Sequence, residues 1–175
     1  MKNPFTRLVW LQPPKNDGNW FKIISDCSAF RRTPGGRHKF MVAGMSAANL
    51  QGVLVSTVDV NVWIGLPARQ YMRVINLCHK LKATIQSPNK IYLSDDTPVV
   101  FIFEVDGLPP FEKEYPPAKW LLFHGKKIPV LPLDRICKSK QVVGRDKDKL
   151  HILLIRQALK LERGAKRAGR KQRGR

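Results

Sequence analysis

The chain has 175 residues, 43% of them hydrophobic, which is enough for one domain with a buried core and excludes a disordered chain. Its 32 Lys and Arg residues against 13 Asp and Glu residues give a formal net charge of +19. A surface with this charge attracts polyanions, so nucleic acid is the expected partner. No apolar run approaches the roughly 18 residues that cross a bilayer, so no membrane partner is expected.

Cysteine and histidine are spaced without any pattern typical of metal binding. The cysteines are odd in number and lack C-x-x-C spacing, so neither a disulfide framework nor a zinc site is predicted: Cys27, Cys78 and Cys137. The histidines are scattered along the chain: His38, His79, His124 and His151. Met1 to Leu11 has no secretory signal pattern. We therefore expect a reducing intracellular compartment, cytoplasm or organelle matrix, and no resident cofactor.

Turn-forming and basic segments divide the chain into three parts. Residues 12–19 are turn formers throughout, which predicts an N-terminal arm over 1–19 and a folded domain over 20–162. Residues 163–175 are rich in Lys, Arg and Gly, which predicts a basic tail.

The first predicted elements of the domain alternate between helix and strand. Helices are predicted over Trp20–Arg31 and Ser46–Leu50, and a buried strand over Lys39–Ala43 that ends at Gly44. The segment Val58–Ile64 alternates with a period of two, as a strand does. One face is apolar, and the other carries Asp59, Asn61 and Trp63.

The remaining elements follow from apolar spacing and turn residues. An apolar stripe at 71, 74, 75, 78 and 81 predicts a helix that packs on the sheet. The other predicted elements are strands at Lys90–Leu93 and Val99–Val105, a hairpin of Lys119–Phe123 with Lys127–Leu131, and helices at Leu133–Val142 and Asp146–Leu161. The sequence thus predicts an α/β (α+β) domain with a mixed central sheet flanked by helices.

Two stretches together resemble the nucleotidyltransferase superfamily, in particular small bacterial proteins of abortive-infection toxin systems. The first is Met41-Val-Ala-Gly-Met-Ser-Ala-Ala-Asn-Leu-Gln-Gly-Val, followed by Ser56-Thr-Val-Asp-Val-Asn-Val-Trp. The second runs from Ile128 to Asp148 and contains Gly144-Arg-Asp-Lys-Asp. The resemblance spans roughly residues 38–160 and implies a nucleotidyltransferase-like fold, with a nucleotide pocket formed by Gly44, Ser46, Asp59, Asn61 and Lys140.

The sequence departs from the pattern of active members of this family. Those members carry Asp-x-Asp on one strand face to hold Mg²⁺, and glycines where the triphosphate approaches. Here Asn61 replaces the second aspartate, and Met45 stands where a glycine would admit phosphate. The third carboxylate is expected on a strand near residues 100–103, where only apolar residues stand, and Glu104 is out of register. The resemblance therefore implies a degenerate active site without catalytic residues; if activity remains, Asp59 and Glu104 carry it, with magnesium.

Several residues keep two interpretations at this stage. Asp59 and Asn61 either belong to the pocket or are polar positions at the edge of a sheet. Lys140 either faces nucleotide phosphates or is a solvated helix lysine. Gly144 and Arg145 favour a turn between two helices, in which we expect Arg145 to pair with an acid such as Asp148. Trp63 shares the face of Asp59 and is expected to fill or cover the pocket.

The basic end is predicted to bind RNA, with its glycines allowing the chain to follow an irregular backbone. The residues involved are Lys160, Arg163, Lys166, Arg167, Arg170, Lys171, Arg173 and Arg175. The sequence thus predicts a non-catalytic RNA-binding pseudoenzyme that is a structural part of a ribosome or another ribonucleoprotein, with neighbouring proteins as further partners. The alternative is a magnesium-dependent nucleotidyltransferase acting on RNA or protein, or one of a toxin-antitoxin system.

Overall fold

A seven-stranded mixed sheet forms the centre of the described part of the chain. The structure, a computed structural model, describes residues 39–65, 71–80, 82–123 and 125–173, so the predicted arm and the predicted helix Trp20–Arg31 lie outside the described residues. The strands are β1 (Lys39–Ala43), β2 (Val60–Gly65), β3 (Thr84–Ser87), β4 (Lys90–Tyr92), β5 (Pro98–Ile102), β6 (Lys119–Phe123) and β7 (Lys126–Val130). The helices are α2 (Gly44–Leu50), α3 (Tyr71–Lys80), α4 (Phe111–Glu114), α5 (Leu133–Val143) and α6 (Asp146–Arg173).

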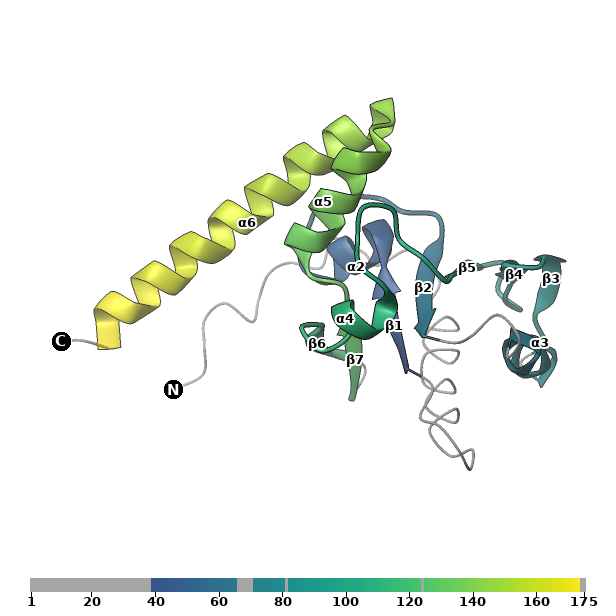
Figure 1. The fold of residues 1–175 in the computed structure, drawn as a ribbon. Coiled ribbons are helices and arrows are strands. Elements are labelled where there is room, and N and C mark those ends of the chain that lie inside the picture. Colours follow the sequence, from purple (N-terminus) through teal and green to yellow (C-terminus); the bar gives the residue numbers. More distant parts are fainter. Residues whose placement is uncertain (1–38, 66–70, 81, 124, 174–175) are drawn as a thin grey trace.

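The sheet has the strand order β3-β4-β5-β2-β1-β7-β6. β2 lies at its middle, antiparallel to β1 and parallel to β5, while β1 is also parallel to β7. β3 and β4 with α3 lie at one side of the sheet, and β6 and β7 at the other (Figure 1). This arrangement confirms the predicted α/β class with a mixed sheet.

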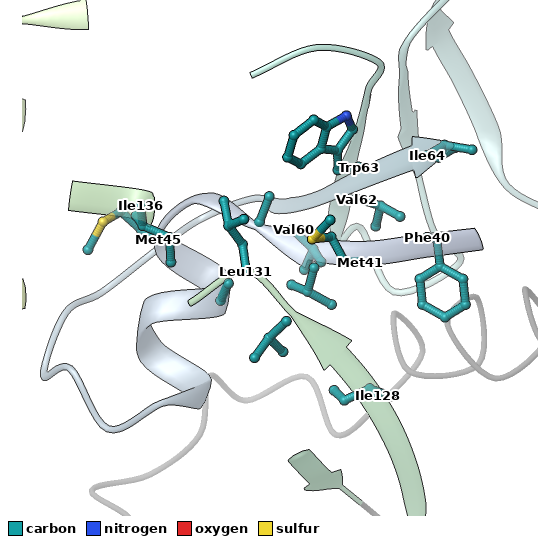
Figure 2. Packing of buried hydrophobic residues seen from close by; sticks show 14 of the residues in the cluster. Phe40, Met41, Met45, Val60, Val62, Trp63, Ile64, Ile128, Leu131 and Ile136 are labelled. Atoms are coloured by element: carbon teal, nitrogen blue, oxygen red, sulfur yellow. The ribbon is translucent and has the colours of Figure 1, made fainter. Parts of the chain in front are cut away.

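The apolar side chains of β2 lie in the core, as its alternating sequence predicted. Val60, Val62 and Ile64 are buried, and Val62 pairs with Val42 of β1 and with Phe101 of β5. Figure 2 shows the labelled side chains of β1 and β2 with those of β7 and the start of α5. Val58 is the exception, because it precedes the strand and is 84% exposed.

The short helix α4, which the sequence analysis did not predict, holds the middle of the sheet to α5. Phe111 of α4 lies edge-on to Trp63 of β2, with ring centroids 5.5 Å apart. The carboxylate of Glu114 is buried and accepts hydrogen bonds from the Arg135 guanidinium of α5, one of them from Nε at 2.8 Å. α4 therefore links β2 to α5 through both apolar and ionic contacts.

Four further elements differ from the predictions. α2 begins at Gly44, two residues early, and β5 ends at Ile102, where the Phe103 carbonyl accepts a hydrogen bond from the Trp63 indole. β3 was missed because its four residues, Thr-Ile-Gln-Ser, carry one apolar side chain and are exposed or half-buried. α6 continues to Arg173, past the predicted end at Leu161.

α6 projects from the body, and its C-terminal half lies apart from the sheet (Figure 1). Its N-terminal part packs on α5 and buries Ile155 completely.

Among the described residues, no helix has both the length and the apolar character to span a membrane. The thiols of Cys78 and Cys137 are free and buried, and burial raises the pKa of Cys78 to about 11.

Two glycines give a matched test of the packing of α4 on β2. At Gly65 an added Cβ would lie 2.4 Å from a ring carbon of Phe111, whereas at Gly164 it would meet no atom within 4 Å. We expect Gly65→Ala to lower the free energy of unfolding by about 1–3 kcal/mol through overpacking. Gly164→Ala should raise it by roughly 0.5–1 kcal/mol, because alanine favours the helix. Urea unfolding of both variants measures this, and equal effects would contradict the described contact.

Candidate functional site

A polar pocket of about 530 Å³ lies at the end of the sheet where β1 ends and β2 begins. Its walls come from the start of α2, the segment 56–59 before β2, the loop 104–106 after β5, and the C-terminal half of α5 with the start of α6. The pocket thus joins residues from both of the stretches that carry the family resemblance.

Gly44 and Asn61 form the base of the pocket. Gly44 has φ +62°, and a Cβ there would lie 2.9 Å from the Asn61 amide nitrogen, so only glycine fits both the backbone and the space. The Ser46 hydroxyl is buried, donates to the Ala43 carbonyl at 2.9 Å, and accepts from the Asn61 backbone N–H at 3.3 Å. Gly44 and Asn61 line the pocket, whereas Ser46 does not line it and links the end of β1 to β2.

Asp59 is half-buried and held by polar neighbours. Its carboxylate accepts long hydrogen bonds, both 3.4 Å, from the Thr57 hydroxyl and from the Asn61 side-chain amide. Both Asp59 and Asn61 line the pocket. The Asn61 amide donates to Asp59 where the active pattern would place a second negative charge.

The register of β5 leaves no carboxylate beside this pair. Asn61 pairs with Val100 in the parallel ladder of β2 and β5, so the two side chains point to the same face. Glu104 comes after the end of β5 and lines the pocket with an exposed side chain. Magnesium prefers several close carboxylate oxygens, and the residues at this position, Asp59 with Asn61 and Val100, do not fit a two-magnesium site. Within the described ranges, no group of three or more His, Cys, Asp or Glu residues could hold a metal ion.

At the wall of the pocket formed by α5 and α6, two lining cations share one buried carboxylate, that of Asp148. It is fully buried and accepts hydrogen bonds from Lys140 Nζ at 2.7 Å and from Arg145 Nε at 3.0 Å. Burial alone would raise the pKa of Asp148, but these hydrogen bonds and the two positive charges outweigh it and lower the pKa from 3.8 to about 2. The predicted pairing of Arg145 with Asp148 is confirmed.

Lys140 lines the pocket, but its charge is already partly matched. Its side chain is only 11% exposed and is bound to Asp148, so the interpretation as a solvated lysine is wrong. Gly144 makes the turn between α5 and α6, with φ +67° and its N–H donating to the Lys140 carbonyl at 2.9 Å. The turn places both cations around one acid.

His151 of α6 completes this wall. Its Nδ1 is buried and lies 3.6 Å from Asp148 Oδ1, too far for a hydrogen bond. Burial and the neighbouring Lys140 charge lower the pKa of His151, although Asp148 opposes the change. Lys147 of α6 also lines the pocket, so three cations, Lys140, Arg145 and Lys147, stand on this side around the single carboxylate of Asp148.

Trp63 and Met45 are buried side chains near the pocket, and only Met45 lines it. Trp63 is fully buried under α4 and does not line the pocket, so the prediction that it fills or covers the site is wrong. The chain runs from the pocket, which Asp59 and Asn61 line, into the core, where Trp63 lies. Met45 is buried and lines the pocket wall near the start of α5, where Figure 2 places it by Ile136.

The predicted RNA-binding residues lie on a helix and not on an irregular tail. Lys160 and Arg163 are exposed on α6. The next five belong to the same helical backbone: Lys166, Arg167, Arg170, Lys171 and Arg173. Arg175 lies outside the described residues. The expectation of an irregular path is thus corrected up to Arg173, because Gly164 and Gly169 lie within the helix.

The sequence analysis missed the loop that closes the pocket. Asp106 lines the pocket, and at Gly107, with φ +72°, an added Cβ would lie 2.5 Å from Val142 of α5. The Asp-Gly pair directly follows the predicted strand Val99–Val105. Nothing in the local sequence indicated that the turn would return to α5.

No profile of a known protein family and no curated protein matches the sequence. Solved structures do match in fold. One is the lincosamide antibiotic adenylyltransferase LnuA with lincomycin bound, with 11% identity, a TM-score of 0.50, and coverage of 79% of this chain and 95% of that one. Another is the antibiotic-resistance factor ANT(2'')-Ia, with 10% identity, a TM-score of 0.51, and coverage of 87% and 91%. This chain has a nucleotidyltransferase-like fold. Identities this low establish the fold alone.

Asp148 and Asp146 give a matched pair of tests at the start of α6. Asp146 is 97% exposed and pairs with Lys149, whereas Asp148 is fully buried between two cations. We expect Asp148→Asn to lower the free energy of unfolding at pH 7 by about 3 kcal/mol, because the nearly buried Lys140 loses its negatively charged partner. Asp146→Asn, with the same change in charge, should have little effect.

The effect of Asp148 should depend on pH in one direction. Its pKa is lowered from 3.8 to about 2, so its stabilisation is complete above the ordinary carboxyl pKa and is lost as the pH falls toward 2. Urea unfolding at several pH values from 7 to about 2 should show the difference between wild type and Asp148→Asn shrinking over the acid range. A difference that stays constant with pH would show that Asp148 acts by packing and not by charge.

Proposed function

We propose that this chain is a non-catalytic RNA-binding protein on a nucleotidyltransferase-like fold, and a structural component of a ribosome or another ribonucleoprotein. The observation that carries the non-catalytic part is the pairing of Asn61 with Val100 next to Asp59. Nucleotidyl transfer needs carboxylates at such adjacent positions, since they hold the ions that neutralise the phosphates. One carboxylate with an amide and an isopropyl group beside it is a poor ligand set.

Electrostatics supports the RNA-binding part. The net charge of +19 would favour phosphate contacts without requiring base readout. The pocket itself does not account for this charge, because two of its cations share Asp148. α6 carries exposed basic residues, among them Arg156, Lys160 and Arg163. The one acid near them in the sequence is Glu162, and it pairs with Lys119. α6 is therefore the best candidate surface for RNA.

A second candidate is nucleotidyl transfer to RNA or protein. It is favoured by the preserved pocket and by the two similar solved structures, one an adenylyltransferase and the other an antibiotic-resistance factor. Under this proposal Asp59 would act with Glu104 or with a group of the substrate, since both residues line the pocket. A toxin-system partner of the same fold would additionally need a cognate protein.

Asp59→Ala separates the two candidates. We expect wild type and variant alike to transfer no label from α-labelled ATP to RNA in the presence of magnesium. We also expect the variant to bind RNA as tightly as wild type or slightly more tightly, because a negative charge is removed. Magnesium-dependent transfer that is present in wild type and lost in the variant would establish the enzyme and overturn the non-catalytic proposal.

RNA binding should depend steeply on salt. Each phosphate contact releases condensed counterions, so three or more contacts should weaken binding at least about 30-fold between about 50 and about 200 mM monovalent salt. Fluorescence anisotropy of a labelled RNA, measured across this range, gives the slope. Binding that is insensitive to salt would exclude phosphate contacts as the source of affinity.

A further inference from the structure

Basic side chains repeat at helical spacing along the exposed side of α6. Arg156, Lys160 and Arg163 are separated by four and then three residues, and all three are exposed. At about 100° per residue these positions fall within roughly 60° of one another around the helix axis. They form one row, which we call the basic row, running along the helix away from the body.

Contacts on another side of α6, roughly 120° around the helix axis from the basic row, fix the direction in which the row points. Ile155 is fully buried, and Ala158 and Leu159 pack against the core. Glu162 pairs with Lys119 of β6 at 2.7 Å. These contacts anchor the inner side of the helix, so the basic row faces outward.

The outer side of α6 is free of negative charge beyond its first turn. From Lys149 to Arg173 the sequence contains a single acid, Glu162, and this acid is bound to Lys119. The sequence continues the four-and-three spacing with Arg167 and Arg170 in the same helix, which runs to Arg173. From Arg156 to Arg170 the rise is about 21 Å at 1.5 Å per residue.

We propose that the basic row binds the phosphates of a double-helical RNA segment. This inference rests on the proposed RNA-binding function and specifies its partner. A helix holds its cations along a straight line, and a single strand would have to straighten against it and lose conformational entropy. A duplex already presents its phosphates on a stiff, regular surface, and proteins recognise duplex RNA mostly by shape and by backbone contacts. A rigid row of cations therefore suits a duplex better than a flexible strand.

The experiment compares two probes and two charge-matched variants of the full chain. The probes are a fluorescein-labelled RNA duplex of about 20 base pairs and its labelled strand alone, chosen to lack self-structure. The test variant is Arg156→Glu with Arg163→Glu. The control is Lys113→Glu with Lys127→Glu, two exposed lysines on α4 and β7, which changes the net charge equally. Circular dichroism confirms that each variant stays folded.

We expect wild type to bind the duplex at least fivefold more tightly than the single strand. The test variant should lose at least tenfold in duplex affinity and the control less than threefold. A control that loses as much as the test variant would show that total charge and not the basic row binds, and would overturn the proposal. So would a single strand that binds as tightly as the duplex.

Two further outcomes separate this proposal from the RNA-binding function itself. If the single strand binds best and the test variant weakens it, the function stands and the duplex proposal fails. If neither probe binds, both fail. Leu153→Ser with Leu161→Ser changes exposed leucines of the same helix. Loss of duplex affinity in this variant equal to that of the test variant would indicate an apolar contact, and would also overturn the phosphate-binding proposal.

Discussion

The buried carboxylate of Asp148 is the interaction on which both the pocket and the projecting helix depend. It is the acceptor for Lys140 at the end of α5 and for Arg145 in the turn, and it belongs to the first turn of α6. The three groups therefore fix the direction in which α6 leaves α5. The Asp148 carboxylate also offsets one of the positive charges at the pocket wall, where Lys140, Arg145 and Lys147 lie. One ion cluster thus orients α6 and limits what the pocket can attract.

The shape of the pocket has its basis in packing and backbone geometry. The strand ends, the left-handed Gly44 and the Asp148 cluster all belong to packing and backbone geometry. Asn61 takes part in this packing, because its side chain lies against Gly44 and donates to Asp59. Val100 pairs with Asn61 across the ladder of β2 and β5. The shape of the pocket therefore does not depend on carboxylates at these two positions.

Sequence alone predicted the parts of the structure that depend on local pattern. The alternation of β2 identified its buried face, and Gly144 followed by Arg145 identified a turn paired with Asp148. Contacts between distant segments were not predictable in this way. Trp63 was expected in the pocket because alternation gives the face of a strand but not which helix covers it, and α4 covers it here. The return of Gly107 to Val142 is of the same kind.

Gly164 and Gly169 read as breakers in the sequence, yet α6 continues through both. Glycine lowers helix stability, and like charges four residues apart, such as Arg156 with Lys160, lower it further. Packing on the body offsets these costs up to Glu162, through Ile155, Ala158 and Leu159 and through the pair of Glu162 with Lys119. A polyanion along the outer side would cancel the repulsion. The cationic character of α6 is unfavourable for the helix by itself and favourable for a helix bound to phosphates, which links its composition to its proposed partner.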